Sequence, residues 1–183
     1  MAVARSDMAE TIIRCGKALV IHALVLALAL LLVWLLTSHY TDANDSVRSQ
    51  YSDPQSVASL LDIARGQLFS WSCACSGIGF LAACLFIGVA QRRHPASPAE
   101  GGSQLWLWVL LFLALLLFTA ISWYPAVYSA GAGASLTPGS YLLAVITVGA
   151  GALLGYFLAT ALTVTLTMKP SVPLAGLLPT FWN

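Results

Sequence analysis

The amino-acid sequence predicts an all-α integral membrane protein, a bundle of four transmembrane helices. The chain of 183 residues is 59% hydrophobic but only 8% charged, whereas a soluble domain carries about 25% charged residues. Four stretches lack Asp, Glu, Lys and Arg: Ala18–Thr37, Leu68–Ala90, Leu105–Trp123 and Tyr141–Met168. Because a helix of about 20 residues crosses the hydrocarbon core of a bilayer, each stretch is a candidate span.

Helices are favoured over strands because an unpaired backbone amide in lipid costs several kcal/mol. A membrane barrel would satisfy its amides too, but its strands alternate apolar and polar residues, and these stretches are apolar almost throughout. The fourth stretch is longer than a span requires, so we expect it to tilt or to extend beyond the membrane at one end. The whole chain, 1–183, is interpreted as a single transmembrane domain.

The basic residues predict the orientation. If the N-terminus is cytoplasmic, the outer loops hold only Arg48 and Arg65, and the other six of the eight Lys and Arg residues are cytoplasmic. The positive-inside rule therefore favours cytoplasmic N- and C-termini. We expect a multi-pass protein of the cell membrane, in a bacterium the inner membrane. The six residues are Arg5, Arg14, Lys17, Arg92, Arg93 and Lys169.

The first span could be mistaken for a secretory signal, because basic residues precede it. Its apolar run exceeds the roughly 7–15 residues of a signal and no A-x-A cleavage pattern follows it, so we expect a retained helix.

The connections are an outer loop at 38–67, an inner loop at 91–104, an outer loop at 124–140 and a cytoplasmic tail at 169–183. In the first outer loop, Asp53 and Pro54 read as an N-cap and a first helical residue. We expect a short amphipathic helix over about 54–65, either on the outer membrane surface or continuous with the second span. Gly66 would be the kink between the two if they are distinct. The tail is rich in proline and apolar enough to rest against the membrane or a partner.

Aromatic residues at the ends of the spans are expected in the headgroup layer, where a ring can be apolar on one edge and hydrogen-bonded on the other. These residues are Trp34, Tyr40, Trp71, Trp106, Trp108, Trp123, Tyr124 and Tyr141.

Small residues recur every four positions on two of the spans, which predicts close helix packing. Spans two and four are therefore expected at the centre of the bundle, and the leucine-rich spans one and three toward lipid. Two interpretations stay open: packing within this chain, or a groove for another subunit. The stripe residues are Thr147, Gly151, Gly155, Ala159 and Thr163 on span four, and Cys75, Gly79 and Ala83 on span two.

Candidate chemistry is sparse. His22 is the one ionisable side chain inside a span, and we expect it to reach the inner interface or to bond a neighbouring helix. Cys73 and Cys75 resemble the outer-face thiols of quinone-linked disulfide-forming membrane proteins, which are also four-helix bundles. Those proteins use CxxC, whereas residues two apart in a helix point in nearly opposite directions. Catalytic and metal motifs are not found in the sequence, so no catalytic residue, metal or cofactor is expected.

These patterns favour a non-enzymatic membrane protein that acts as a subunit, anchor or accessory factor of a larger assembly, such as secretion, conjugation or envelope machinery. Its expected partners are the lipid bilayer and other membrane subunits. Nucleic acid is not expected, because the net charge is only +1 and phosphate binding needs a basic face. A small oligomeric transporter or channel is the alternative, and a thiol-redox enzyme the third. A channel would use hydroxyls of Ser72, Ser76, Thr147, Thr160, Thr163, Thr165 and Thr167.

Overall fold

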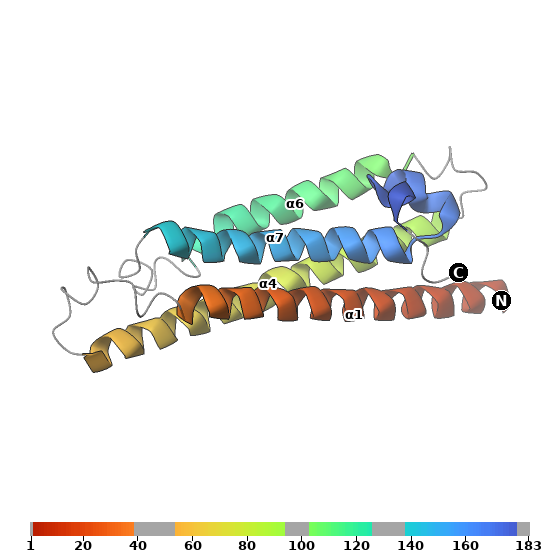
Figure 1. Ribbon diagram of the computed structural model, residues 1–183. Helices are drawn as coiled ribbons and strands as arrows, with labels where there is room; N and C mark the ends of the chain where they lie inside the picture. The colour runs from red at the N-terminus through yellow and green to blue at the C-terminus, as the bar shows by residue number, and fades with distance from the viewer. Residues whose placement is uncertain (1, 39–53, 94–102, 126–137, 179–183) are drawn as a thin grey trace.

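The computed structural model describes residues 2–38, 54–93, 103–125 and 138–178. Four long α-helices lie side by side in a bundle (Figure 1): α1 (Ala2–Ser38), α4 (Pro54–Arg93), α6 (Leu105–Trp123) and α7 (Pro138–Thr163). Two short 3-10 helices follow, η3 (Leu166–Ser171) and η4 (Ala175–Leu177). All four α-helices are long and apolar enough to cross a membrane. The predicted all-α membrane bundle is confirmed.

The interior of the bundle lies mainly along α4 and α7. In the most apolar part of each helix, 44% of the α7 residues and 39% of the α4 residues are buried, against 17% in both α1 and α6. The helices α1, α4 and α7 pack on one another, and α6 packs against α4 and α7. The leucine side chains of α1 and α6 are largely exposed, as expected for helices that face lipid.

The first helix is longer than its predicted span. It begins at Ala2, and its apolar part extends from Met8 to Leu36. An ion pair one turn apart, with Arg14 Nη2 2.6 Å from Glu10 Oε1, stabilises the added turns. The predicted span begins where the charged residues end, whereas the helix itself includes the charged residues before that point.

The short helix predicted near 54–65 and the second span form one continuous helix, α4. Its first residue is Pro54, as expected. There is no break at Gly66. A glycine inside a helix costs only about 1 kcal/mol relative to alanine, too little to interrupt a helix that packs along most of its length. The expected N-cap Asp53 and the aromatic residue Tyr40 lie outside the described residues. Tyr141 lies in α7, but its side chain is outside the description.

The fourth helix ends at Thr163, so the predicted boundary at Met168 was wrong. Thr165 is extended, with φ −66° and ψ 162°, and the chain continues as the 3-10 helix η3. One feature explains the early end. The run from Thr163 to Thr167 is rich in β-branched residues, which disfavour helix. Pro170 would stop an α-helix only near Lys169, because it has no amide to donate and disfavours helix at the residue before it.

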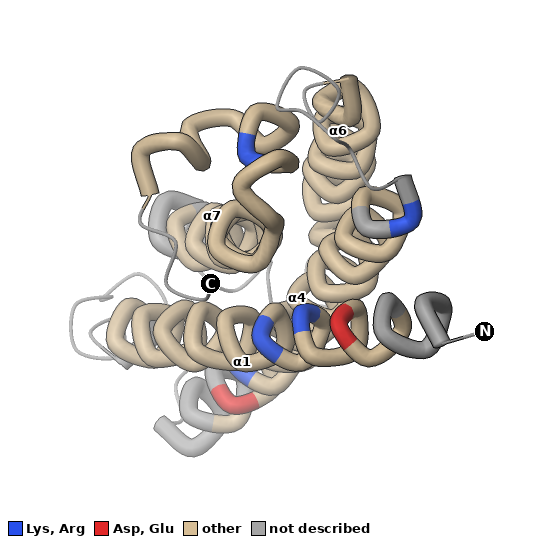
Figure 2. The backbone as a smooth tube through the Cα atoms, turned by 90° about the vertical axis from the view of Figure 1, so that its right-hand side faces the viewer, with Lys and Arg blue, Asp and Glu red and all other residues tan. Residues whose placement is uncertain are grey.

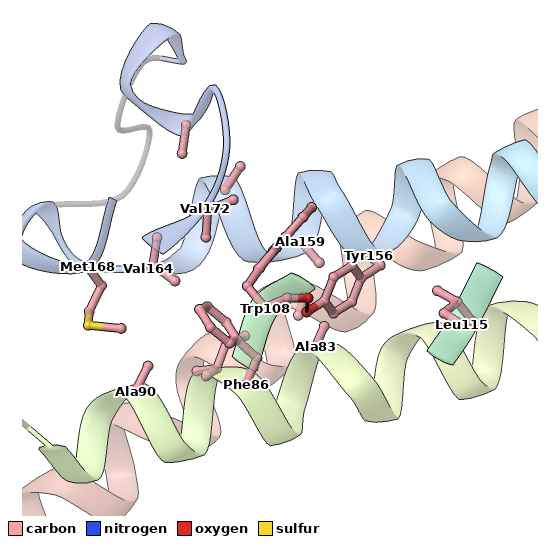
Figure 3. Packing of buried hydrophobic residues seen from close by; sticks show 14 residues of the cluster. Ala83, Phe86, Ala90, Trp108, Leu115, Tyr156, Ala159, Val164, Met168 and Val172 are labelled. Carbon is pink, nitrogen blue, oxygen red and sulfur yellow. Dashed lines mark hydrogen bonds between the residues drawn. The ribbon is translucent and has the colours of Figure 1, made fainter. Parts of the chain in front are cut away.

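The C-terminal segment packs against the bundle of its own chain. Met168, Val172 and Ala175 are buried in one cluster with Phe86 and Ala90 of α4. Figure 3 shows Met168 and Val172 turned toward that part of the bundle. A hydrogen bond from Lys169 Nζ to the Leu178 carbonyl oxygen, 2.6 Å long, closes the segment. Through residue 178, part of the tail therefore packs inside this molecule, whereas Leu174 and Leu177 are 69% and 81% exposed. Contact of the tail with the membrane or a partner stays a prediction.

Candidate functional site

The small-residue stripe of α7 faces α1 at its two glycines. A Cβ built on Gly151 would lie 3.0 Å from Ala29 Cβ, and one built on Gly155 would lie 3.1 Å from His22 Cδ2. Both distances are tighter than ordinary contacts, so a larger residue at either position would require α1 to shift by a few tenths of an ångström. Further along the stripe, Ala159 and Thr163 are buried, and Thr147 is half-buried. At the two glycines α1 occupies the stripe; the binding of another subunit to this face stays a prediction.

The stripe of α4 lies at the point where several helices meet. A Cβ on Gly79 would lie 3.3 Å from the Ala152 carbonyl oxygen of α7, 3.4 Å from His22 Nε2 of α1 and 3.4 Å from Leu115 Cδ2 of α6. Gly79 is therefore close to all three other helices. The other two members, Cys75 and Ala83, are fully buried.

His22 fills the space between these glycines. Its side chain is only 3% exposed, and its ring meets that of Phe80 edge-on with 5.9 Å between centroids. Nδ1 lies 3.0 Å from the Ala18 carbonyl oxygen, and since a carbonyl only accepts, the proton of the neutral ring is on Nδ1. Among the residues that the structure describes, none is a hydrogen-bond partner of Nε2. The expectation that His22 bonds a neighbouring helix or reaches the interface was wrong, because Gly79 and Gly155 leave room for the ring inside the bundle.

An aromatic cluster joins α6 to α7. Trp108 Nε1 donates to Thr160 Oγ1 at 2.9 Å, and Tyr156 Oη donates to the Trp108 carbonyl oxygen at 3.2 Å. Figure 3 shows Trp108 and Tyr156 side by side, next to Ala83 and Phe86 of α4. The Trp108 ring also stacks on Phe112, with 5.1 Å between centroids.

Two tryptophans predicted as interfacial anchors are therefore core residues. Trp108 is 5% exposed and Trp71 is 4% exposed. Each indole N–H finds a partner inside the bundle, since Trp71 Nε1 donates to Ser122 Oγ of α6 at 2.9 Å, and a satisfied indole can be buried. Trp34, Trp106 and Tyr124 are more than half exposed, as an anchor would be.

Most hydroxyls of the suggested polar path turn back onto their own helix. Ser72 Oγ donates to the Leu68 carbonyl oxygen at 2.6 Å, Thr147 Oγ1 to that of Leu143 at 2.8 Å, and Thr163 Oγ1 to that of Ala159 at 2.5 Å. Such bonds satisfy a hydroxyl in an apolar environment. In this structure, these three hydroxyls are therefore hydrogen-bonded to the backbone of their own helices.

Charged groups gather toward the N-terminal end of α1, beside the end of α7 (Figure 2). Arg14 donates through Nη1 to the Thr163 carbonyl oxygen, the last residue of α7. A cation at a helix C-terminus is favourable because the terminal carbonyls carry partial negative charge. Arg14 thus ties α1 to the point where α7 ends and η3 follows.

The cysteines carry free thiols. Cys75 is fully buried and Cys73 is half-buried, so the redox interpretation stays a prediction. Cys84 lies close to Cys15 of α1, a proximity that sequence reasoning missed. They lie far apart in the chain, and no spacing motif could have revealed them. In the described part of the chain, His, Cys, Asp and Glu do not form groups of three or more that could hold a metal ion.

Comparisons with protein-family models, with curated proteins and with solved structures give no match to this chain. A function is therefore argued from the helices, their exposed surfaces and their packing.

Proposed function

We propose that this chain is a non-enzymatic subunit, anchor or accessory factor of a larger membrane assembly. We place it in a cell membrane, in a bacterium the inner membrane, with both termini cytoplasmic. The topology rests on the distribution of basic residues. The role as a subunit rests on the length of two helices compared with the thickness of a bilayer.

The observation that carries the proposal is that α1 and α4 are longer than the membrane requires. They have 37 and 40 residues, or about 55 and 60 Å at about 1.5 Å per residue, against about 30 Å of hydrocarbon. Their N-terminal parts extend from opposite ends of the bundle (Figure 1). Ile63, in the extension of α4, is 50% exposed, and Ile12, near the start of the apolar part of α1, is 66% exposed. Helical extensions with exposed apolar residues give another protein a surface to bind outside the lipid.

The interior of the bundle supports the same proposal. Large side chains such as Phe86, Leu115 and Tyr156 are buried between the helices, and the aromatic cluster of α6 and α7 is hydrogen-bonded internally. This packing suits a structural element. A channel would need several copies of the chain, with hydroxyls released from their backbone bonds.

Site-specific photocrosslinking tests the proposal. A photoreactive amino acid is placed at Ile63 in the extension of α4 or at Ile12 near the start of the apolar part of α1, and at Leu117, which is 60% exposed and lies within the span of α6. We expect a covalent adduct with one distinct membrane protein from Ile12 or Ile63, and none from Leu117. Native mass spectrometry of the purified complex should give the same partner. A mass corresponding only to copies of this chain, together with ion conductance in planar bilayers, would instead support the oligomeric channel.

A further inference from the structure

A groove separates α1 from α4 at the end of the bundle where α1 ends. Its volume is about 380 Å³, within the roughly 300–1,000 Å³ of small-molecule sites. Among the described residues, its lining is apolar apart from the guanidinium of Arg65. The lining residues are Leu30, Val33 and Trp34 of α1 and Arg65, Gly66 and Phe69 of α4.

The depth of the groove follows from the two spans. Arg65 is the first residue of the apolar part of α4, and Trp34 lies two residues before the end of the apolar part of α1. Both therefore lie at the level of the headgroups, where Trp and Arg are favoured. Leu30 and Phe69 lie about one helical turn deeper, at the level of the acyl chains.

We propose that this groove binds a glycerophospholipid, with an acyl chain along Leu30, Val33 and Phe69 and the phosphate on Arg65. An apolar groove open to the bilayer gains dispersion contacts when an acyl chain fills it. A guanidinium matches a phosphate because two parallel N–H donors meet two oxygens. Arg65 Nη1 also lies 3.5 Å from Asp62 Oδ1, but Asp62 is 76% exposed, and exposed pairs of this kind are weak. A phosphate can compete for the guanidinium.

Gly66 keeps the groove open. A Cβ built on Gly66 would meet no described residue within 4 Å, unlike one built on Gly79 or Gly155. The glycine is therefore not required by a neighbouring helix, and a larger side chain at this position would enter the groove without a clash. Gly77, on the same helix, also has nothing within 4 Å but does not line the groove.

Lipid titration in native mass spectrometry tests the proposal. The full chain is delipidated in detergent and titrated with phosphatidylglycerol or with diacylglycerol, which lacks the phosphate. We expect Gly66→Leu to lose binding of both lipids and the matched variant Gly77→Leu to keep both. Arg65→Gln should weaken phosphatidylglycerol about tenfold or more, because a hydrogen bond to a charged group is lost, and leave diacylglycerol unchanged. Arg92→Gln, an exposed arginine outside the groove, is the charge control.

Three results would overturn the proposal. Equal lipid occupancy in Gly66→Leu and Gly77→Leu would remove the groove as the site. Equal affinity of the wild-type chain for the two lipids would remove the role of the phosphate. Displacement of the lipid by excess inorganic phosphate would identify a free anion as the ligand. Thermal melting by circular dichroism checks that each variant is folded, and if Gly66→Leu is not, Arg65→Gln decides.

Discussion

The centre of the bundle depends on contacts of two glycines with one imidazole. His22 lies against Gly155 of α7 and Gly79 of α4, so the ring takes space that any larger residue at either position would occupy. In lipid, helices associate through such close packing, because burial of apolar surface gives no driving force between them. We therefore expect the bundle to be most sensitive to substitution at these positions.

Gly155→Leu tests this packing. The new Cβ would lie 3.1 Å from His22 Cδ2, and overpacking of this kind costs about 1–3 kcal/mol. The control is Gly149→Leu on the same helix, where a Cβ meets nothing within 4 Å. Melting in detergent should show a lower Tm for Gly155→Leu and an unchanged or higher Tm for Gly149→Leu. Adding His22→Ala to Gly155→Leu should recover part of the loss. Equal melting of the two leucine variants would refute the close contact.

The small-residue stripe could be recognised in the sequence, but the helix that fills it could not. The repeat of Gly151 and Gly155 at a spacing of four is visible by inspection. The partner is α1, whose sequence reads as a leucine-rich, lipid-facing helix. Its two decisive residues, His22 and Ala29, do not form a pattern that distinguishes one face of the helix from the others.

Among the helices, α6 is fixed to α7 by a side-chain hydrogen bond in the core. Trp108 Nε1 donates to Thr160 Oγ1 at 2.9 Å, and both residues are buried. Polar bonds between membrane helices contribute about 0.6 kcal/mol on average and at most about 1.7 kcal/mol. The bond is therefore a modest but specific link between the two helices.

A double-mutant cycle measures this link. Trp108→Phe and Thr160→Val are made singly and together, and the free energy of unfolding is measured in detergent micelles. We expect a coupling of about 0.6–1.7 kcal/mol. As a control, Thr160→Val is paired with Trp106→Phe, which changes a tryptophan that is 58% exposed, and this cycle should give a coupling near zero. A coupling near zero in the first cycle as well would mean that the bond does not hold α6 to α7.

Helix boundaries were predicted well where composition changes sharply and poorly where it does not. The bounds of α6 agree with the predicted span, Leu105–Trp123, because polar residues precede it and Tyr124 and Pro125 follow it. The end of α7 was placed too late, because hydropathy continues through Val164 and Leu166 while backbone geometry changes at Thr165. Hydropathy indicates which residues favour lipid. It contains little information about the backbone conformations that β-branched residues and proline favour.

For the whole molecule, the sequence predicts the number of spans because the thickness of the bilayer sets the minimum length of an apolar stretch that can cross it. It does not predict how the helices are arranged, since every helix here is apolar on most of its faces. The groove between α1 and α4 was missed for the same reason. Its lining residues come from two helices, and none of them belongs to a motif.

The central claim is a chain that crosses the membrane four times with both termini in the cytoplasm, and site-directed labelling tests it most directly. In a background in which the four cysteines are replaced, Ser46→Cys and Ser97→Cys are introduced singly, one in each of the first two predicted loops. A membrane-impermeant maleimide is then applied to intact cells and to permeabilised cells. We expect the cysteine at 46 to be labelled in intact cells and the cysteine at 97 to be labelled only after permeabilisation. Labelling of both from the same side of the membrane would contradict the claim.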